Sequence, residues 1–99
     1  MVDLKAMFEK MDDEFLKFDR IVNPPHPRPD LCAFLMLHKL TEGTKESTRD
    51  MVGAAEYEQI WLSVDMDMLA ARATIDDIRD LSRCGVRYDD NIESLCMSV

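Results

Sequence analysis

The sequence predicts an α+β fold in which four helices pack mainly on one face of a small sheet, antiparallel or mixed, with about three strands. One observation is the helical spacing of apolar residues near the N-terminus, and another is their alternation over residues 58–64. A third is the order of the patterns along the chain: helix, helix, strand, helix, helix, strand, strand. With 99 residues, 46% of them apolar, we expect a single domain spanning 1–99 with one modest core.

The first predicted helix covers residues 3–20, with Asp3 as its N-cap. Its apolar side chains are separated alternately by four and three residues, which is typical of a helix that packs along another helix. They are Leu4, Phe8, Met11, Phe15, Phe18 and Val22. Residues 1–22 should therefore form a helical arm. A proline-rich connector at 23–29 joins this arm to the rest, because residues around proline favour extended backbone.

The second helix is predicted from Leu31 to about Thr41, with Asp30 as its N-cap and Gly43 just beyond its end. This helix is apolar nearly all round, so we expect it to form the buried centre of the fold. A buried strand is the alternative for the apolar run 31–37. Residues 43–49 are predicted to form a polar loop. Residues 50–56 fit a helix or a strand, since Gly53 weakens both interpretations.

A strand is predicted over residues 58–64, with Ile60, Leu62 and Val64 on one face and Tyr57 and Trp61 on the other. If helices leave the second face uncovered, its aromatic side chains are available for an interface; a second packed layer is the alternative. The side chains expected to be largely buried in the core are Phe34, Leu35, Leu37, Ile60, Leu62, Ile78 and Leu81.

Two short helices and a hairpin complete the chain. Asp65 should cap the first helix, and Thr74 with Asp77 should form a capping box on the second. The core stripe of the second helix is Ile75, Ile78 and Leu81, and Gly85 follows its C-terminus. The hairpin turns at residues 89–91. A two-residue turn at 90–91 would pair Val86 with Leu95.

Charge and cysteine content limit the function classes. The net charge is −8, and residues 50–99 carry eleven acidic and four basic side chains, against nine and eight in residues 1–49. This field repels nucleic acid and anionic membranes, so neither is expected as a direct ligand. The three cysteines are odd in number and far apart. They indicate small core side chains in a reducing, cytoplasmic setting.

One segment has the form of a catalytic motif. Asp65-Met66-Asp67 directly follows an apolar strand, and it resembles the first motif of haloacid-dehalogenase-type phosphotransferases. The resemblance implies a nucleophile at Asp65, an acid/base at Asp67 and a nearby Mg²⁺. It covers Ile60 to Asp67 and departs from the family at Leu69, where Thr or Val is usual. The ordinary interpretation makes Asp65 an N-cap and Asp67 a first-turn acid.

No metal, cofactor or catalytic residue is predicted from the remaining acids and histidines. The acids of residues 76–90 do not have EF-hand spacing. His26 and His38 have no cysteine or histidine partner at zinc-ligand spacing. Ion pairs along a solvated helix face explain the acids.

The leading hypothesis is a small, acidic, non-enzymatic interaction protein that self-associates as a homodimer. Its predicted interface residues are Leu4, Phe8, Met11, Phe15, Phe18 and Trp61. The first helix could instead fold back on its own core. One alternative function is an acidic inhibitor or adaptor that masks a basic macromolecule through Asp76, Asp77, Asp80, Asp89 and Asp90. Another is a small metal-dependent phosphotransfer or hydrolytic enzyme centred on Asp65 and Asp67.

Overall fold

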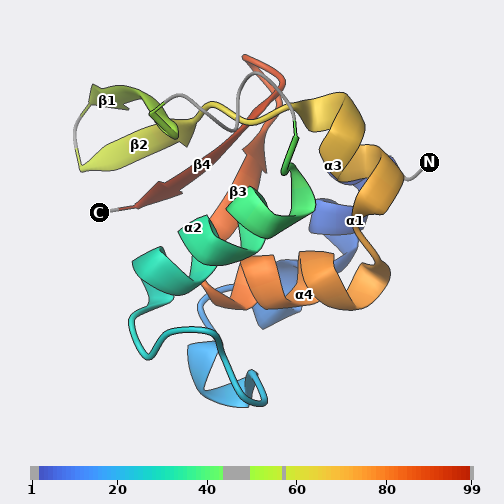
Figure 1. Cartoon of the computed structure of the whole chain (residues 1–99), viewed down its shortest axis with the longest axis vertical. Helices are drawn as coiled ribbons and strands as arrows, with labels where there is room; N and C mark the ends of the chain where they lie inside the picture. Colours follow the sequence, from blue (N-terminus) through green and yellow to red (C-terminus); the bar gives the residue numbers. More distant parts are fainter. Residues whose placement is uncertain (1–2, 44–49, 57, 99) are drawn as a thin grey trace.

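The computed structural model describes residues 3–43, 50–56 and 58–98 (Figure 1). Within these ranges, four α-helices accompany a four-stranded antiparallel sheet of strand order β1-β2-β4-β3. The predicted α+β class is confirmed, with one strand more than the three or so expected. The elements are α1 Leu4–Lys10, α2 Pro29–Leu40, β1 Val52–Glu56, β2 Gln59–Leu62, α3 Met66–Arg72, α4 Ile75–Arg83, β3 Val86–Asp89 and β4 Ser94–Ser98.

The N-terminal segment is not the continuous helix predicted over 3–20. Asp3 caps α1 as expected, since the Ala6 N–H donates to Asp3 Oδ1 (3.2 Å). After α1, the chain forms two 3-10 helices, η1 (Asp12–Glu14) and η2 (Phe18–Arg20), separated by Leu16 at φ +63°. The Leu16 N–H donates to the carbonyl oxygen of Ser82 (3.1 Å). Leu16 therefore has a left-handed backbone and makes a tertiary hydrogen bond at a position where the sequence pattern predicts another turn of the first helix.

Helix α2 begins at Pro29, two residues before the predicted start. Arg28 is its N-cap residue and makes no side-chain cap bond, so the predicted cap at Asp30 is wrong. Proline suits the first helical position because its φ is already fixed near the helical value. The helical interpretation of residues 31–37 is confirmed over the strand alternative. The chain leaves α2 through Thr41.

Only one side of α2 is buried, because the helix packs against α3 and α4 on that side. Leu37 is fully buried, as predicted, whereas Phe34 is half-buried and Leu35 is 47% exposed. The prediction of a helix buried all round was therefore wrong for Phe34 and Leu35.

The core lies between the helices and the inner face of the sheet. The predicted core positions Ile60, Leu62, Ile78 and Leu81 are all buried. Ile75, predicted as part of the core stripe of α4, is 52% exposed, so that prediction was wrong; Ile75 is the first residue of the helix. The large side chains that are fully buried include Leu37, Leu62, Leu69, Ile78, Leu81, Val86 and Leu95.

The caps of α3 and α4 are those predicted. The Met68 N–H donates to Asp65 Oδ1 (3.0 Å). Thr74 and Asp77 form a reciprocal capping box, in which each side chain accepts from the other residue's backbone N–H. Gly85 follows α4 at φ +100°, a conformation that favours glycine.

The C-terminal hairpin has a longer connection than predicted. Asp89 pairs with Ser94, so residues 90–93 form the loop, and Val86 pairs with Met97 in place of Leu95. The Asn91 N–H donates to Asp89 Oδ1 (2.9 Å), a side-chain turn that lengthens the loop beyond two residues.

Residues 50–56, which fitted either element, contain strand β1. It pairs with β2 from Glu56↔Gln59 to Val52↔Leu62, with a bulge at Gly53. A Cβ at Gly53 would overlap the Ser63 Oγ, so this bulge suits glycine. β1 is an outer strand of the sheet, and Figure 1 draws it on the far side of β2 from β4.

Candidate functional site

The six predicted interface residues lie in two separate environments. Leu4 and Phe8 are buried in the chain's own core, where α1 packs against α4 and β3. Met11 and Phe18 are partly buried against that core, and Phe15 is half-buried. Trp61 lies on the other face of the sheet. The structure therefore places four of the six residues in or against the core of their own chain, and Trp61 on the opposite face of the sheet. The four are Leu4, Phe8, Met11 and Phe18.

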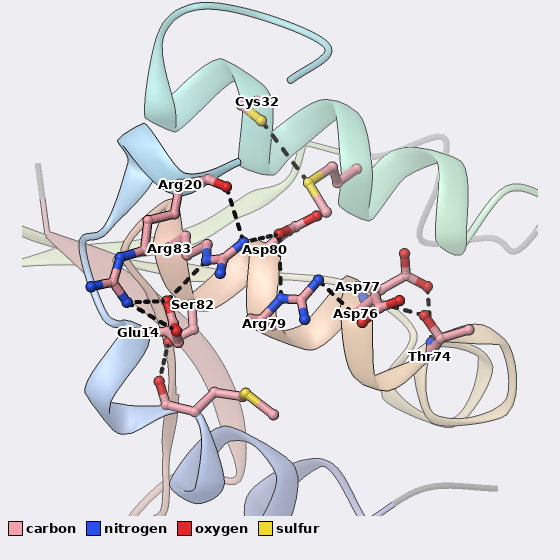
Figure 2. A network of polar contacts seen from close by, with 12 residues as sticks. Glu14, Arg20, Cys32, Thr74, Asp76, Asp77, Arg79, Asp80, Ser82 and Arg83 are labelled. Carbon is pink, nitrogen blue, oxygen red and sulfur yellow. Dashed lines mark hydrogen bonds and ion pairs between the residues drawn. The ribbon is translucent and has the colours of Figure 1, made fainter. Parts of the chain in front are cut away.

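A polar network fastens the N-terminal segment to α4 (Figure 2). Arg83 Nε donates to Glu14 Oε2 (3.0 Å), and Arg83 Nη1 donates to Asp80 Oδ1 and to the carbonyl oxygen of Arg20 (both 3.2 Å). Ser82 Oγ donates to the carbonyl oxygen of Met11 (3.1 Å). The hydrogen bond from Arg83 holds the pKa of Glu14 below its ordinary value. This segment is bound to its own domain by specific contacts.

The outer face of the sheet carries Trp61. Along β2, Ile60 and Leu62 are buried in the core and Trp61 alternates with them, which confirms the predicted faces. Trp61 is half-buried, and its Nε1 donates to Asp89 Oδ2 (2.9 Å) across the sheet. This hydrogen bond holds the pKa of Asp89 below its ordinary value. Tyr57, predicted on the same face, lies outside the described residues.

Strand β1 is the most exposed element of the sheet. All five of its residues are exposed, and among the described residues its ladder pairing is with β2 on one side only. The other outer strand, β3, is packed against α1 and α4. An unpaired edge presents backbone N–H and C=O groups to which another strand can bind. The sequence patterns did not indicate this edge, although the run Val52-Gly53-Ala54-Ala55 is a short segment of uncharged residues that lies between Met51 and Glu56.

The acids that the sequence proposed for binding a basic partner already have partners inside the chain. Asp76 and Asp80 pair with Arg79 and Arg83, Asp77 belongs to the capping box, Asp89 accepts from Trp61, and Asp90 pairs with Lys5. By contrast, Asp50, Glu56 and Glu58 are exposed, and no ion pair joins them to any other residue of the described ranges. Asp50 and Glu58 therefore flank β1 as unpaired acids and Glu56 ends it, although other exposed acids, such as Asp12, Asp13 and Asp19, also make no ion pair within the described ranges.

A groove of about 850 Å³ is formed by residues of three segments of the chain. It lies between α2 and the segment 21–25, with the exposed side chains of Val22 and Leu35 in its lining. His38 and Lys39 line it from α2, and Asp77 and Asp80 line it from α4. Glu42 also lines this groove, so three acids and one lysine meet in it.

The remaining chemical candidates have structural roles. Asp65 caps α3 and Asp67 is exposed in its first turn. Within the described ranges, no cluster of three or more His, Cys, Asp or Glu side chains has the arrangement of a metal site. All three cysteines are buried, as predicted. Burial raises the pKa of Cys84 and of Cys96, and the neighbouring Cys32 thiol raises that of Cys84 further. Thiols held in the protonated form are weak nucleophiles.

Comparison with known proteins gives no match: no family model, no curated protein and no solved structure is similar to this chain. Among its described helices, none combines the length and apolar character needed to cross a bilayer. The function must therefore be argued from the surface itself, and the features that distinguish this surface are the free edge of β1 and the acids beside it.

Proposed function

We propose that this protein is a non-enzymatic interaction module that binds an extended segment of another protein along the free edge of β1. The observation that supports this proposal is the state of β1, which is exposed at all five positions and, within the part of the chain that the structure describes, paired on one side only. In strand addition, main-chain hydrogen bonds supply the affinity and alternate side chains supply the specificity. The bulge at Gly53 leaves Ala54–Glu56 as the regular part of this edge.

A second copy of the chain is the competing occupant of this edge, although the homodimer hypothesis from the sequence placed its interface on the first helix and Trp61. Every charged residue from Asp50 to Glu58 is acidic. Pairing two copies of β1 would bring these like charges together, which disfavours self-association at this edge. Leu4 and Phe8, two proposed anchors of a helix-mediated dimer, are buried in their own core. These observations favour a different protein as the partner.

The test uses two neighbouring proline substitutions, Ala54→Pro and Ala55→Pro. Successive residues of an antiparallel strand direct their backbone groups to opposite sides, so one proline removes a donor to β2 and the other removes a donor at the free edge. The variant that keeps the wild-type melting temperature has lost only the edge donor. That variant is the probe, and Leu35→Asp, which alters the groove, is its matched control.

Proteins from the native host are retained on immobilised wild type, on the edge variant and on Leu35→Asp. We expect a partner that the wild type and Leu35→Asp retain and the edge variant loses. Retention by the edge variant, loss with Leu35→Asp alone, or no partner on the wild type would overturn the proposal. Light scattering tests the remaining possibility, that a second copy of the chain binds this edge. A wild-type dimer that the edge proline converts to a monomer would identify a second copy as the occupant and refute a separate partner.

A further inference from the structure

We infer that the strand accepted by β1 is basic and alternates lysine or arginine with apolar residues. This inference rests on the proposed function and names the chemistry of its partner. It depends on the sheet register, which assigns each position of an incoming strand to one of two faces with different surroundings.

The register shows which side chains of β2 lie beside each face of β1. Directly paired residues of antiparallel strands point to the same face. Ala54 pairs with Trp61, and Glu56 pairs with Gln59, so both lie on the outer face. Ala55 pairs with Ile60 and lies on the inner face, in a row that continues into the core. A partner strand therefore meets an acid and an aromatic ring on one face and an apolar row on the other.

The outer face suits cationic side chains. A lysine or arginine next to Glu56 would gain an ion pair with an exposed carboxylate. One next to Ala54 would extend over a side chain of a single methyl group toward Trp61. Neighbouring strands are about 4.8 Å apart, so two long side chains can meet across Ala54. A cation within about 6 Å of an indole ring is attracted to its face.

The inner face suits apolar side chains. A partner residue next to Ala55 extends the row formed by Ile60, Met97 and Val86, all of which are buried. A polar side chain in this row would gain no partner from it, whereas an apolar one would cover the exposed end of the core. The alternation of cationic and apolar residues follows from these two faces.

The chain around β1 is negatively charged, as Glu56 is. Residues 50–71 contain five acidic side chains and neither lysine nor arginine. Within the described ranges, the basic side chain recorded in contact with this hairpin is Arg87, whose Nη2 donates to Gln59 Oε1 (2.9 Å). Asp50, Glu56 and Glu58 therefore remain available to a cationic strand, and they repel an acidic one.

The single tryptophan provides a direct readout, because Trp61 lies one strand from the edge. Fluorescence titrations use three short peptides in which valine alternates with lysine, threonine or glutamate. We expect the lysine peptide to bind about three- to tenfold more tightly than the threonine peptide at low salt, a preference that high salt reduces. The glutamate peptide should not bind measurably.

Three variants separate the inference from the function on which it rests. Glu56→Gln with Glu58→Gln should remove the preference for lysine, whereas Asp12→Asn with Asp13→Asn, an equal charge change at exposed sites elsewhere, should keep it. The edge proline should abolish binding of both peptides. Equal binding of lysine and threonine peptides, sensitive to the edge proline, would refute the basic partner alone. Absence of all binding, or binding that ignores the edge proline, would refute strand addition itself.

Discussion

Burial changes steeply across one row of the sheet. Val86 on β3, Met97 on β4 and Ile60 on β2 are 0%, 3% and 7% exposed, whereas Ala55 on β1 is exposed. The helices thus cover three strands and leave the fourth uncovered. Folding free energy comes mainly from buried apolar area, so the covered strands should set stability. The uncovered edge is then available for recognition at little structural cost.

The largest effect should come from Leu37, the fully buried residue of α2. We expect Leu37→Ala to lower the free energy of unfolding by about 2–5 kcal/mol, from lost burial and the cavity left behind. Urea denaturation followed by circular dichroism measures the change. Leu35→Ala is the control on the same helix and should stay within about 0.5 kcal/mol. Similar losses in the two variants would contradict the one-sided burial of α2.

A smaller effect is expected at the start of α4, which covers the sheet. Thr74→Ala removes the acceptor for the Asp77 N–H and should cost about 1 kcal/mol, while Thr74→Ser should restore most of it. Chemical denaturation of the three proteins tests this directly.

The cap of α3 provides a related comparison. Asp65→Ser should leave stability within about 0.5 kcal/mol of wild type, because serine caps comparably. Melting curves with and without Mg²⁺ add a second readout. A stabilisation by Mg²⁺ that disappears in Asp65→Ser would show that Asp65 does more than cap the helix, and it would favour the enzyme hypothesis.

The outer face should respond to pH through Asp89. The hydrogen bond from Trp61 lowers the pKa of Asp89 in the folded state. The stabilisation from this hydrogen bond is therefore fully present above the ordinary carboxyl pKa of about 3.9. It is lost as the pH falls through the lowered pKa of Asp89 in the folded state. Trp61→Phe should destabilise the protein more at neutral pH than at about pH 3. A difference between the two proteins that does not change with pH, measured by circular dichroism, would exclude this coupling.

The smallest effect is predicted at the edge itself. Ala55→Ser should change the free energy of unfolding by less than about 0.5 kcal/mol, because its side chain faces solvent. Ile60→Val, one strand inward in the same row, should cost about 0.5–1.5 kcal/mol. If the two substitutions had equal effects on urea midpoints, the edge would be part of the core and not a separate surface.

Several features fixed by neighbours in the chain were predictable from sequence, although the cap expected at Asp30 and the two-residue turn at 90–91 were not found. The caps at Asp3 and Asp65 and the capping box of Thr74 with Asp77 depend on residues three positions apart, and the structure contains all of them. The buried and exposed faces of β2 were also predictable, since alternation encodes them directly.

Features fixed by distant contacts were not predictable. The apolar spacing through Phe15 and Phe18 indicated one long helix, but Leu16 adopts a left-handed conformation and binds Ser82. The candidate site depends on which strand lies at the edge, and strand order is a tertiary property. The acids of residues 76–90 looked available because their internal partners include distant ones such as Lys5 and Trp61.

The attachment of the N-terminal segment has a consequence for synthesis on the ribosome. Ser82 and Arg83 hold Met11 and Glu14 across 71 and 69 positions of the chain. Residues 11–14 can therefore dock on α4 only after residues 82 and 83 have emerged from the ribosome. Contacts of such long separation slow folding, because the intervening chain must be closed into a loop first. The apolar side chains of Leu4 and Phe8 would stay exposed during that interval, when chaperones can bind them.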